Sequence, residues 1–177
     1  MVTSLACADE RLATNTCIVS YSDIFYHQEA VSSLIQVDAD VAITYDPNWQ
    51  ALWAKRFDDP LQDAESFRLN RDGTVALIGG RVDDAGRIEG QYMGLLRFSP
   101  RGWAEVQRVR SELASRALDR LDMTSMLQRV VEAGRLPVVA IPYEGEWGEV
   151  DDQQDLELYN SSKFVDPPDA SESMSDR

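Results

Sequence analysis

Along this chain, continuous runs of apolar residues alternate with segments in which apolar residues recur at helical spacing. Apolar runs of the kind found in buried strands cover residues 18–20, 39–45, 89–99 and 136–142. Residues 64–70 and 74–80 flank an Arg71-Asp-Gly73 turn, which predicts a hairpin. Apolar residues at helical spacing predict helices over residues 4–14, 26–36, 47–53, 100–118, 123–133 and 152–159. The order of these elements predicts one mixed sheet flanked by helices.

Composition narrows the class of protein. The chain has 177 residues, enough for one domain with a real core, and we expect that domain to cover residues 1–163. Residues 164–177 are rich in Pro, Ser and acid and are expected to be a disordered tail. A net charge of −14 argues against nucleic acid and anionic membranes as partners. With two cysteines and no signal peptide or long apolar run, we expect a cytoplasmic protein.

Two acidic residues stand where strands are expected to end. Asp23 closely follows the apolar run at Ile18, and Asp151 lies in Trp147-Gly-Glu-Val-Asp151, between a predicted strand and a predicted helix. Ligands of open α/β sheets bind beyond the carboxyl ends of strands. Mg²⁺ prefers oxygen ligands and usually binds one or two carboxylates together with substrate phosphates. We therefore predict a shared Mg²⁺ site at Asp23 and Asp151, although each acid could also be a helix cap or turn residue.

Two further segments carry polar groups that suit a small ligand. Residues 88–94 place two glycines in a predicted strand, which indicates that a ligand or a backbone approaches closely, or that an edge strand is bulged. Arg81 follows a Gly-Gly pair, and its planar guanidinium suits phosphate. The same sequence is equally compatible with an exposed arginine that binds only solvent.

Together these segments resemble nucleotidyltransferases that couple CTP or another NTP to a small phosphorylated or phosphonylated acceptor. The nearest resemblance is to the phosphocholine and 2-aminoethylphosphonate cytidylyltransferase branch, which is related to sugar-1-phosphate nucleotidyltransferases. Residues 20–24 resemble that family's strand-end segment with a metal-binding Asp, and residues 78–82 and 89–94 its substrate-side segments. Residues 147–151, followed by Asp155-Leu156, resemble its closing W-x-E-[IV]-D segment.

The resemblance implies a fold, a reaction and roles for particular residues. It implies a GT-A-type, Rossmann-like sheet that is mostly parallel, and transfer of a nucleotidyl group, CMP if the donor is CTP, with release of pyrophosphate. Asp23 and Asp151 would be the catalytic residues and the Mg²⁺ ligands. Substrate binding would fall to five residues: Arg81, Glu89, Gln91, Tyr92 and Glu149.

One feature of the family is not found in this chain. The family opens with a glycine-rich loop that holds the NTP phosphates, whereas no glycine precedes Asp23 here. We therefore expect the N-terminal β-α units to be missing and the isolated chain to show little turnover. We also expect it to self-associate or to pair with a missing N-terminal segment, because the strand at Ile18 would become an open edge. The alternatives are a non-catalytic or degenerate binding domain and a GT-A-like glycosyltransferase, although the latter predicts an Asp-x-Asp pair where Tyr21-Ser-Asp23 stands.

Overall fold

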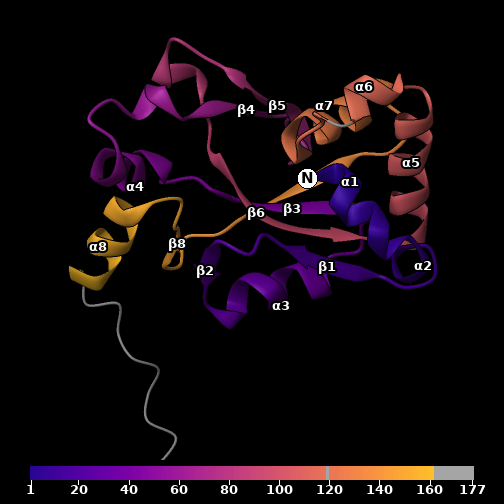
Figure 1. The fold of residues 1–177 in the computed structure, drawn as a ribbon, viewed down its shortest axis with the longest axis horizontal. Coiled ribbons are helices and arrows are strands. Elements are labelled where there is room, and N and C mark those ends of the chain that lie inside the picture. The colour runs from indigo at the N-terminus through magenta and orange to yellow at the C-terminus, as the bar shows by residue number, and fades with distance from the viewer. Residues whose placement is uncertain (119, 162–177) are drawn as a thin grey trace, which may run out of the picture.

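The computed structural model describes residues 1–118 and 120–161 (Figure 1). Its α-helices are α1 (Val2–Leu5), α2 (Asp9–Leu12), α3 (Gln28–Gln36), α4 (Trp49–Arg56), α5 (Pro100–Ser111), α6 (Ser115–Leu118), α7 (Met123–Ala133) and α8 (Gln153–Ser161). Short 3₁₀ helices are η1 (Ala6–Ala8), η2 (Pro60–Gln62) and η3 (Ala85–Arg87). The strands are β1 (Cys17–Ser20), β2 (Ile24–Tyr26), β3 (Val41–Asp46), β4 (Glu65–Leu69), β5 (Val75–Arg81), β6 (Gln91–Phe98), β7 (Val138–Pro142) and β8 (Trp147–Glu149). The expected tail at residues 164–177 lies outside the described residues.

The central sheet has the strand order β1-β6-β3-β7. Its core strand β3 is buried at all six positions, as its continuous apolar run predicts. The expectation of a mostly parallel sheet is wrong, because β6 runs antiparallel to both β1 and β3, while β3 and β7 pair in parallel. A strand buried on both faces has the same apolar pattern in either direction, so the pattern of β6 could not reveal its direction.

Helices cover the central sheet (Figure 1). Helix α3 packs against β1, β3 and β6, while α5 and α7 pack against each other and against strands that include β6 and β7. Helix α7 has the predicted bounds because both of its ends carry clear signals. The Asp122 side chain accepts a hydrogen bond from the Ser125 backbone amide (2.7 Å), and Gly134 ends the helix at φ 63°.

Two small antiparallel pairs lie beside the central sheet. The predicted hairpin is present as β4 and β5, and an isolated bridge between Thr74 and Val139 ties it to β7. Strands β2 and β8 pair with each other, and no apolar pattern of usable length marked these three-residue strands. The helix predicted over residues 100–118 is broken after Ser111 into α5 and α6. In the part of the chain that the structure describes, no helix is long and apolar enough to span a membrane.

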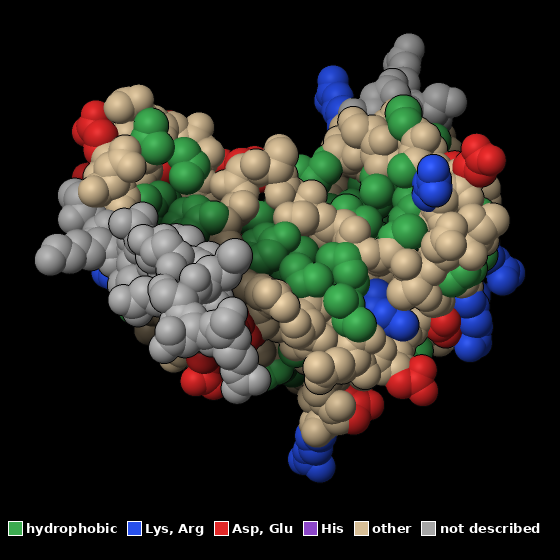
Figure 2. All heavy atoms as spheres, turned by 90° about the horizontal axis from the view of Figure 1, so that it is seen from below, with side chains coloured by type: hydrophobic (Ala, Val, Ile, Leu, Met, Phe, Trp, Pro, Cys, Tyr) green, Lys and Arg blue, Asp and Glu red, His purple; other side chains and the backbone are tan. Residues whose placement is uncertain are grey.

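Strand β1 is an edge of the central sheet. It pairs with β6 on one side, and within residues 1–118 and 120–161 no strand pairs with its other side. Figure 2 views the molecule from the side on which β1, β2 and α3 lie, and hydrophobic side chains gather near the middle of this face. Ile35 at the end of α3 is 64% exposed. An unpaired edge strand with nearby apolar surface is a site where another strand can add.

Candidate active site

The pairing of β2 with β8 brings Asp23 and Asp151 together. Asp23 directly precedes β2, and Asp151 follows β8 by two residues. Ile24 pairs with Glu149 in antiparallel register, and the Val150 amide donates to the Asp23 carbonyl (2.9 Å). The two acids therefore meet where one short strand begins and its partner ends. The sequence predicted their proximity but gave a different reason for it, the ends of two neighbouring strands of the main sheet.

Asp23, Glu149 and Asp151 form a compact carboxylate cluster. Each offers one oxygen atom, and these three atoms lie within 4.8 Å of one another. Asp23 and Asp151 are exposed, while Glu149 is half-buried. An all-oxygen donor set of this size fits Mg²⁺ or a similar hard cation, since such ions bind carboxylates at about 2.1 Å and keep positions open for substrate oxygens. Metal binding by Asp23 and Asp151 remains a prediction.

Arg56 at the end of α4 fixes this cluster from the buried side. Its side chain is 1% exposed, and its guanidinium contacts Glu149 (3.2 Å), Asp151 (2.7 Å) and Asp155 (2.8 Å). The guanidinium also lies over the rings of Trp53 and Phe57, 5.7 and 5.1 Å from their centroids. A planar fork suits several carboxylates at once, and a cation at a helix C-terminus is favourable. Each carboxylate has a second oxygen, so Arg56 orients Glu149 and Asp151 without using up their ligand atoms.

Helix α8 supports the same cluster through its first turn. The Asp152 side chain accepts hydrogen bonds from the amides of Gln154 (2.8 Å) and Asp155 (3.1 Å), which caps the helix. The Asp155 carboxylate in turn accepts one from the Asp151 amide (3.0 Å). Asp155 therefore links Arg56 to the backbone that presents Asp151.

The contacts at this site perturb the ionisation of Glu149 and Asp155. Burial raises the pKa of Glu149 to about 7, the negative charges of Asp151 and Asp23 act in the same direction, and Arg56 partly opposes them. Burial alone would raise the pKa of Asp155, but hydrogen bonds from Arg56 and from the Asp151 amide bring it below its ordinary value. The raised pKa favours the protonated form of Glu149 near neutral pH.

A pocket of about 250 Å³ adjoins the carboxylate cluster. Glu149 and Asp151 line it together with aromatic and acidic residues: Tyr21, Trp53, Asp63, Glu65, Tyr92 and Asp122. Of the residues predicted to bind substrate, Gln91, Tyr92 and Glu149 line this pocket. The amide of Gln91 is occupied, however, because it both accepts from and donates to the backbone of Glu65 (3.1 and 2.6 Å).

Two predicted substrate residues lie elsewhere. Arg81 is exposed and lines a different, smaller pocket beside the β4–β5 hairpin. Glu89 is exposed and accepts a hydrogen bond from the Leu69 amide (2.7 Å), so it braces β4. The structure does not bring either residue to the pocket beside Asp151. Their spacing in the sequence gave no information on where in the fold their side chains would lie.

The glycines of residues 88–94 serve close packing within the protein. Gly94 has φ +81°, and a Cβ atom there would lie 2.7 Å from the ring of Tyr21. A Cβ atom at Gly90 would meet the ring of Tyr45. The close approach is therefore made chiefly by the aromatic side chains of Tyr21 and Tyr45, where a ligand or a backbone was expected. Tyr21 also forms an edge-to-face pair with Tyr92 in the pocket wall, with ring centroids 5.8 Å apart.

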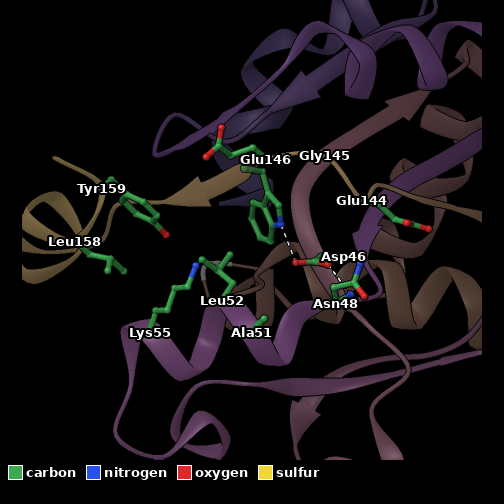
Figure 3. A pocket seen from close by; sticks show the side chains of 11 residues that line it. Asp46, Asn48, Ala51, Leu52, Lys55, Glu144, Gly145, Glu146, Leu158 and Tyr159 are labelled. Atoms are coloured by element: carbon green, nitrogen blue, oxygen red, sulfur yellow. Dashed lines mark hydrogen bonds between the residues drawn. The ribbon is translucent and has the colours of Figure 1, made fainter. Parts of the chain in front are cut away.

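A second pocket, of about 340 Å³, lies between α4, α8 and the loop before β8 (Figure 3). In its wall, Asp46 is 6% exposed and accepts hydrogen bonds from the Trp147 indole (2.9 Å) and the Asn48 amide (2.6 Å). Burial raises the pKa of Asp46, which these hydrogen bonds partly counter. Through its bond with Trp147, the first residue of β8, Asp46 holds this strand in place.

Comparisons with known proteins agree with this architecture. The chain is 34% identical over 160 residues to a CTP:phosphoglutamine cytidylyltransferase of Campylobacter jejuni, an alignment that covers 87% of this chain and 61% of that protein. By sequence, the chain is therefore a homologue of a cytidylyltransferase. No family model matches the chain. It spans about three fifths of the length of this curated relative.

Two solved nucleotidyltransferases share the fold at low identity. The inositol-1-phosphate CTP transferase from T. maritima matches with a TM-score of 0.64 and 18% identity, over 92% of this chain and 62% of that one. A putative glucose-1-phosphate thymidylyltransferase from Bacillus anthracis matches with a TM-score of 0.66 and 12% identity, over 94% and 62%. At these identities the likeness concerns the fold alone.

The principal site residue that sequence reasoning missed in this nucleotidyltransferase homologue is Arg56. A cation in the last turn of an amphipathic helix commonly interacts with the helix dipole, so the sequence around it gave no reason to link it to Asp151. Asp155 was noted as part of a closing segment, but its contact with Arg56 could not be foreseen. The cues available were its place four residues after Asp151 and at the start of a predicted helix.

Proposed function

We propose that this chain forms the metal- and acceptor-binding part of a cytidylyltransferase, which transfers CMP from CTP to a small phosphorylated or phosphonylated acceptor and releases pyrophosphate. The observation that carries the proposal is the cluster of Asp23, Glu149 and Asp151 beside a pocket. The similarity to a CTP:phosphoglutamine cytidylyltransferase over 160 residues supports the reaction class.

The side chains at this site have distinct roles in the proposed reaction. Asp23 and Asp151, with Glu149 beside them, would hold Mg²⁺, which when bound offsets the negative charge of the reacting phosphates. Arg56 orients Glu149 and Asp151. The acceptor's anionic oxygen attacks the α-phosphorus of CTP, and the bond to pyrophosphate breaks. Because that oxygen is already deprotonated, the protein contributes positioning and electrostatic stabilisation and needs no general base.

The wall of the pocket favours an acceptor that carries a positive group. Three acidic residues, Asp63, Glu65 and Asp122, line the pocket. The aromatic residues Tyr21 and Tyr92 line it as well. Carboxylates and aromatic faces attract ammonium groups. An amine-bearing phosphate such as phosphoethanolamine is therefore expected to bind more tightly than ethyl phosphate, which has the same phosphate and no amine.

Equilibrium binding tests the proposal independently of turnover. Calorimetry with Mg²⁺ and phosphoethanolamine should show that acceptor binding requires Mg²⁺. Asp23→Asn and Asp151→Asn should each remove most of this Mg²⁺-dependent affinity. The matched control is Asp152→Asn, because an asparagine still caps α8. Acceptor binding that ignores both EDTA and the two substitutions would overturn the proposal. Turnover with CTP is expected to be low in this chain, which has no glycine before Gly73.

A further inference from the structure

A pocket of about 170 Å³ lies beside the β4–β5 hairpin and shares no lining residue with the pocket of the candidate active site. It is formed by both strands of the hairpin and by the segment that follows β5. Its lining residues are Ser66, Arg68, Leu77, Arg81, Val82, Asp83 and Arg87. Three of these seven are arginines, which is unusual in a protein with 31 acidic and 17 basic residues.

These three arginines have no carboxylate partner among the residues that the structure describes. Arg68, Arg81 and Arg87 are exposed, and none forms an ion pair with any carboxylate of residues 1–118 and 120–161. Three other arginines of the chain do so: Arg56, Arg101 and Arg135. Asp83 is the one acidic residue in the lining, so positive charge predominates there. A site of this sign attracts anions even though the whole protein repels them.

A β-bulge directly precedes Arg81 in β5. Glu65 pairs with Arg81 and Phe67 pairs with Ile78, so Gly79 and Gly80 together oppose Ser66. Both glycines have positive φ, +80° and +82°, and the Ser66 hydroxyl donates a hydrogen bond to the Gly79 carbonyl. Bulges re-aim side chains and are common beside functional sites.

We propose that this pocket binds a phosphate group through Arg68, Arg81 and Arg87, as a second anion site separate from the carboxylate cluster. Guanidinium groups match the geometry of phosphate oxygens and form charge-assisted hydrogen bonds with them. The pocket is large enough for one such group and too small for a whole nucleotide. The phosphate can come from a free ion or from the exposed end of a larger molecule.

Titration calorimetry and backbone NMR at low ionic strength test the site. Orthophosphate, pyrophosphate and CTP are each titrated into the whole chain in EDTA, so that Mg²⁺-dependent binding is excluded. We expect saturable binding, with amide shifts centred on residues 66–68 and 79–87. Similar affinities for orthophosphate and CTP would identify a site for the phosphate alone, whereas much tighter binding of pyrophosphate or CTP would identify the end of a polyphosphate.

Single arginine variants distinguish binding in this pocket from nonspecific electrostatic attraction. Arg68→Gln and Arg81→Gln should each weaken binding roughly fivefold or more. The control is Arg71→Gln, which removes the same charge from the turn of the same hairpin but lies outside the lining. Equal losses in all three variants, or no saturable binding in the wild type, would refute the proposal. Asp151→Asn should leave this binding unchanged, so the phosphate site can stand even if the proposed transferase activity does not.

Discussion

Replacement of Arg56 by methionine should destabilise the protein more than loss of any exposed ion pair. The guanidinium is 1% exposed and hydrogen-bonds to three carboxylates, whose side chains are 25% (Glu149), 51% (Asp151) and 7% (Asp155) exposed. Without it, Asp155 would keep a negative charge in an almost dry position beside two other acids. Removal of one member of a buried ion pair costs about 3–5 kcal/mol, whereas a half-exposed partner such as Asp151 adds about 1 kcal/mol or less.

We therefore expect Arg56→Met to lower the free energy of unfolding by about 3–5 kcal/mol at pH 7.5, with a fall in Tm of roughly 6–20 °C. Urea denaturation followed by tryptophan fluorescence measures this, because Trp53 lies next to the guanidinium. Arg101→Met is the control. Arg101 is 74% exposed and 3.1 Å from Asp40, so its loss should cost less than about 1 kcal/mol.

Two further measurements decide whether the charge network is the cause. The loss should be smaller at pH 5 than at pH 7.5, because Glu149, without the opposing charge of Arg56, would take up a proton more readily. The double variant Arg56→Met/Asp155→Leu should recover much of the lost stability, since a buried ion pair can often be replaced by apolar groups of similar size. A loss below about 1 kcal/mol, or an equal loss at both pH values, would refute this reasoning.

The structure leads to four other predictions. Burial raises the pKa of Glu149 to about 7, so the folded protein holds a proton that the unfolded chain releases above about pH 4.5. The contribution of this group to the free energy of unfolding should therefore fall as the pH rises from 4.5 to 7. Glu149→Gln should flatten this pH dependence in urea titrations. At pH 6.5, Mg²⁺ should displace this proton in unbuffered calorimetry, and no release would count against Glu149 as part of the cation site. Gly94→Ala should cost about 1–3 kcal/mol more than Gly134→Ala, since both have positive φ but only the former would strike a side chain, Tyr21; equal costs in thermal melts would assign the effect to backbone strain. Self-association through β1 should appear in light scattering at micromolar concentration and weaken when Val19 is replaced by lysine, and a monodisperse monomer would contradict it.

Long elements with clear end signals could be predicted from the sequence. Helix α7 begins after a capping Asp122 and ends at Gly134, and its predicted bounds are the observed ones. The buried run of β3 and the Asp-Gly turn of the hairpin were similarly informative. The direction of β6 was not, because direction depends on how strands meet in space and a doubly buried strand looks the same both ways. The three-residue strands β2 and β8 are too short for periodicity to detect.

The same limit explains what the sequence could and could not say about the site. Asp23 and Asp151 were singled out because their residue type and their position after apolar runs suggested metal chemistry, and the structure places them close together. The groups that hold them in place were not found, because Arg56 is 93 residues before Glu149 and 99 before Asp155 in the chain. Contacts between residues so far apart leave no mark on local sequence patterns. Positioning residues of this kind have ordinary local roles, here a cation at a helix C-terminus. Three acids gathered at one point would repel one another without such a counter-charge, so a predicted carboxylate site is itself a reason to search the rest of the chain for a buried arginine.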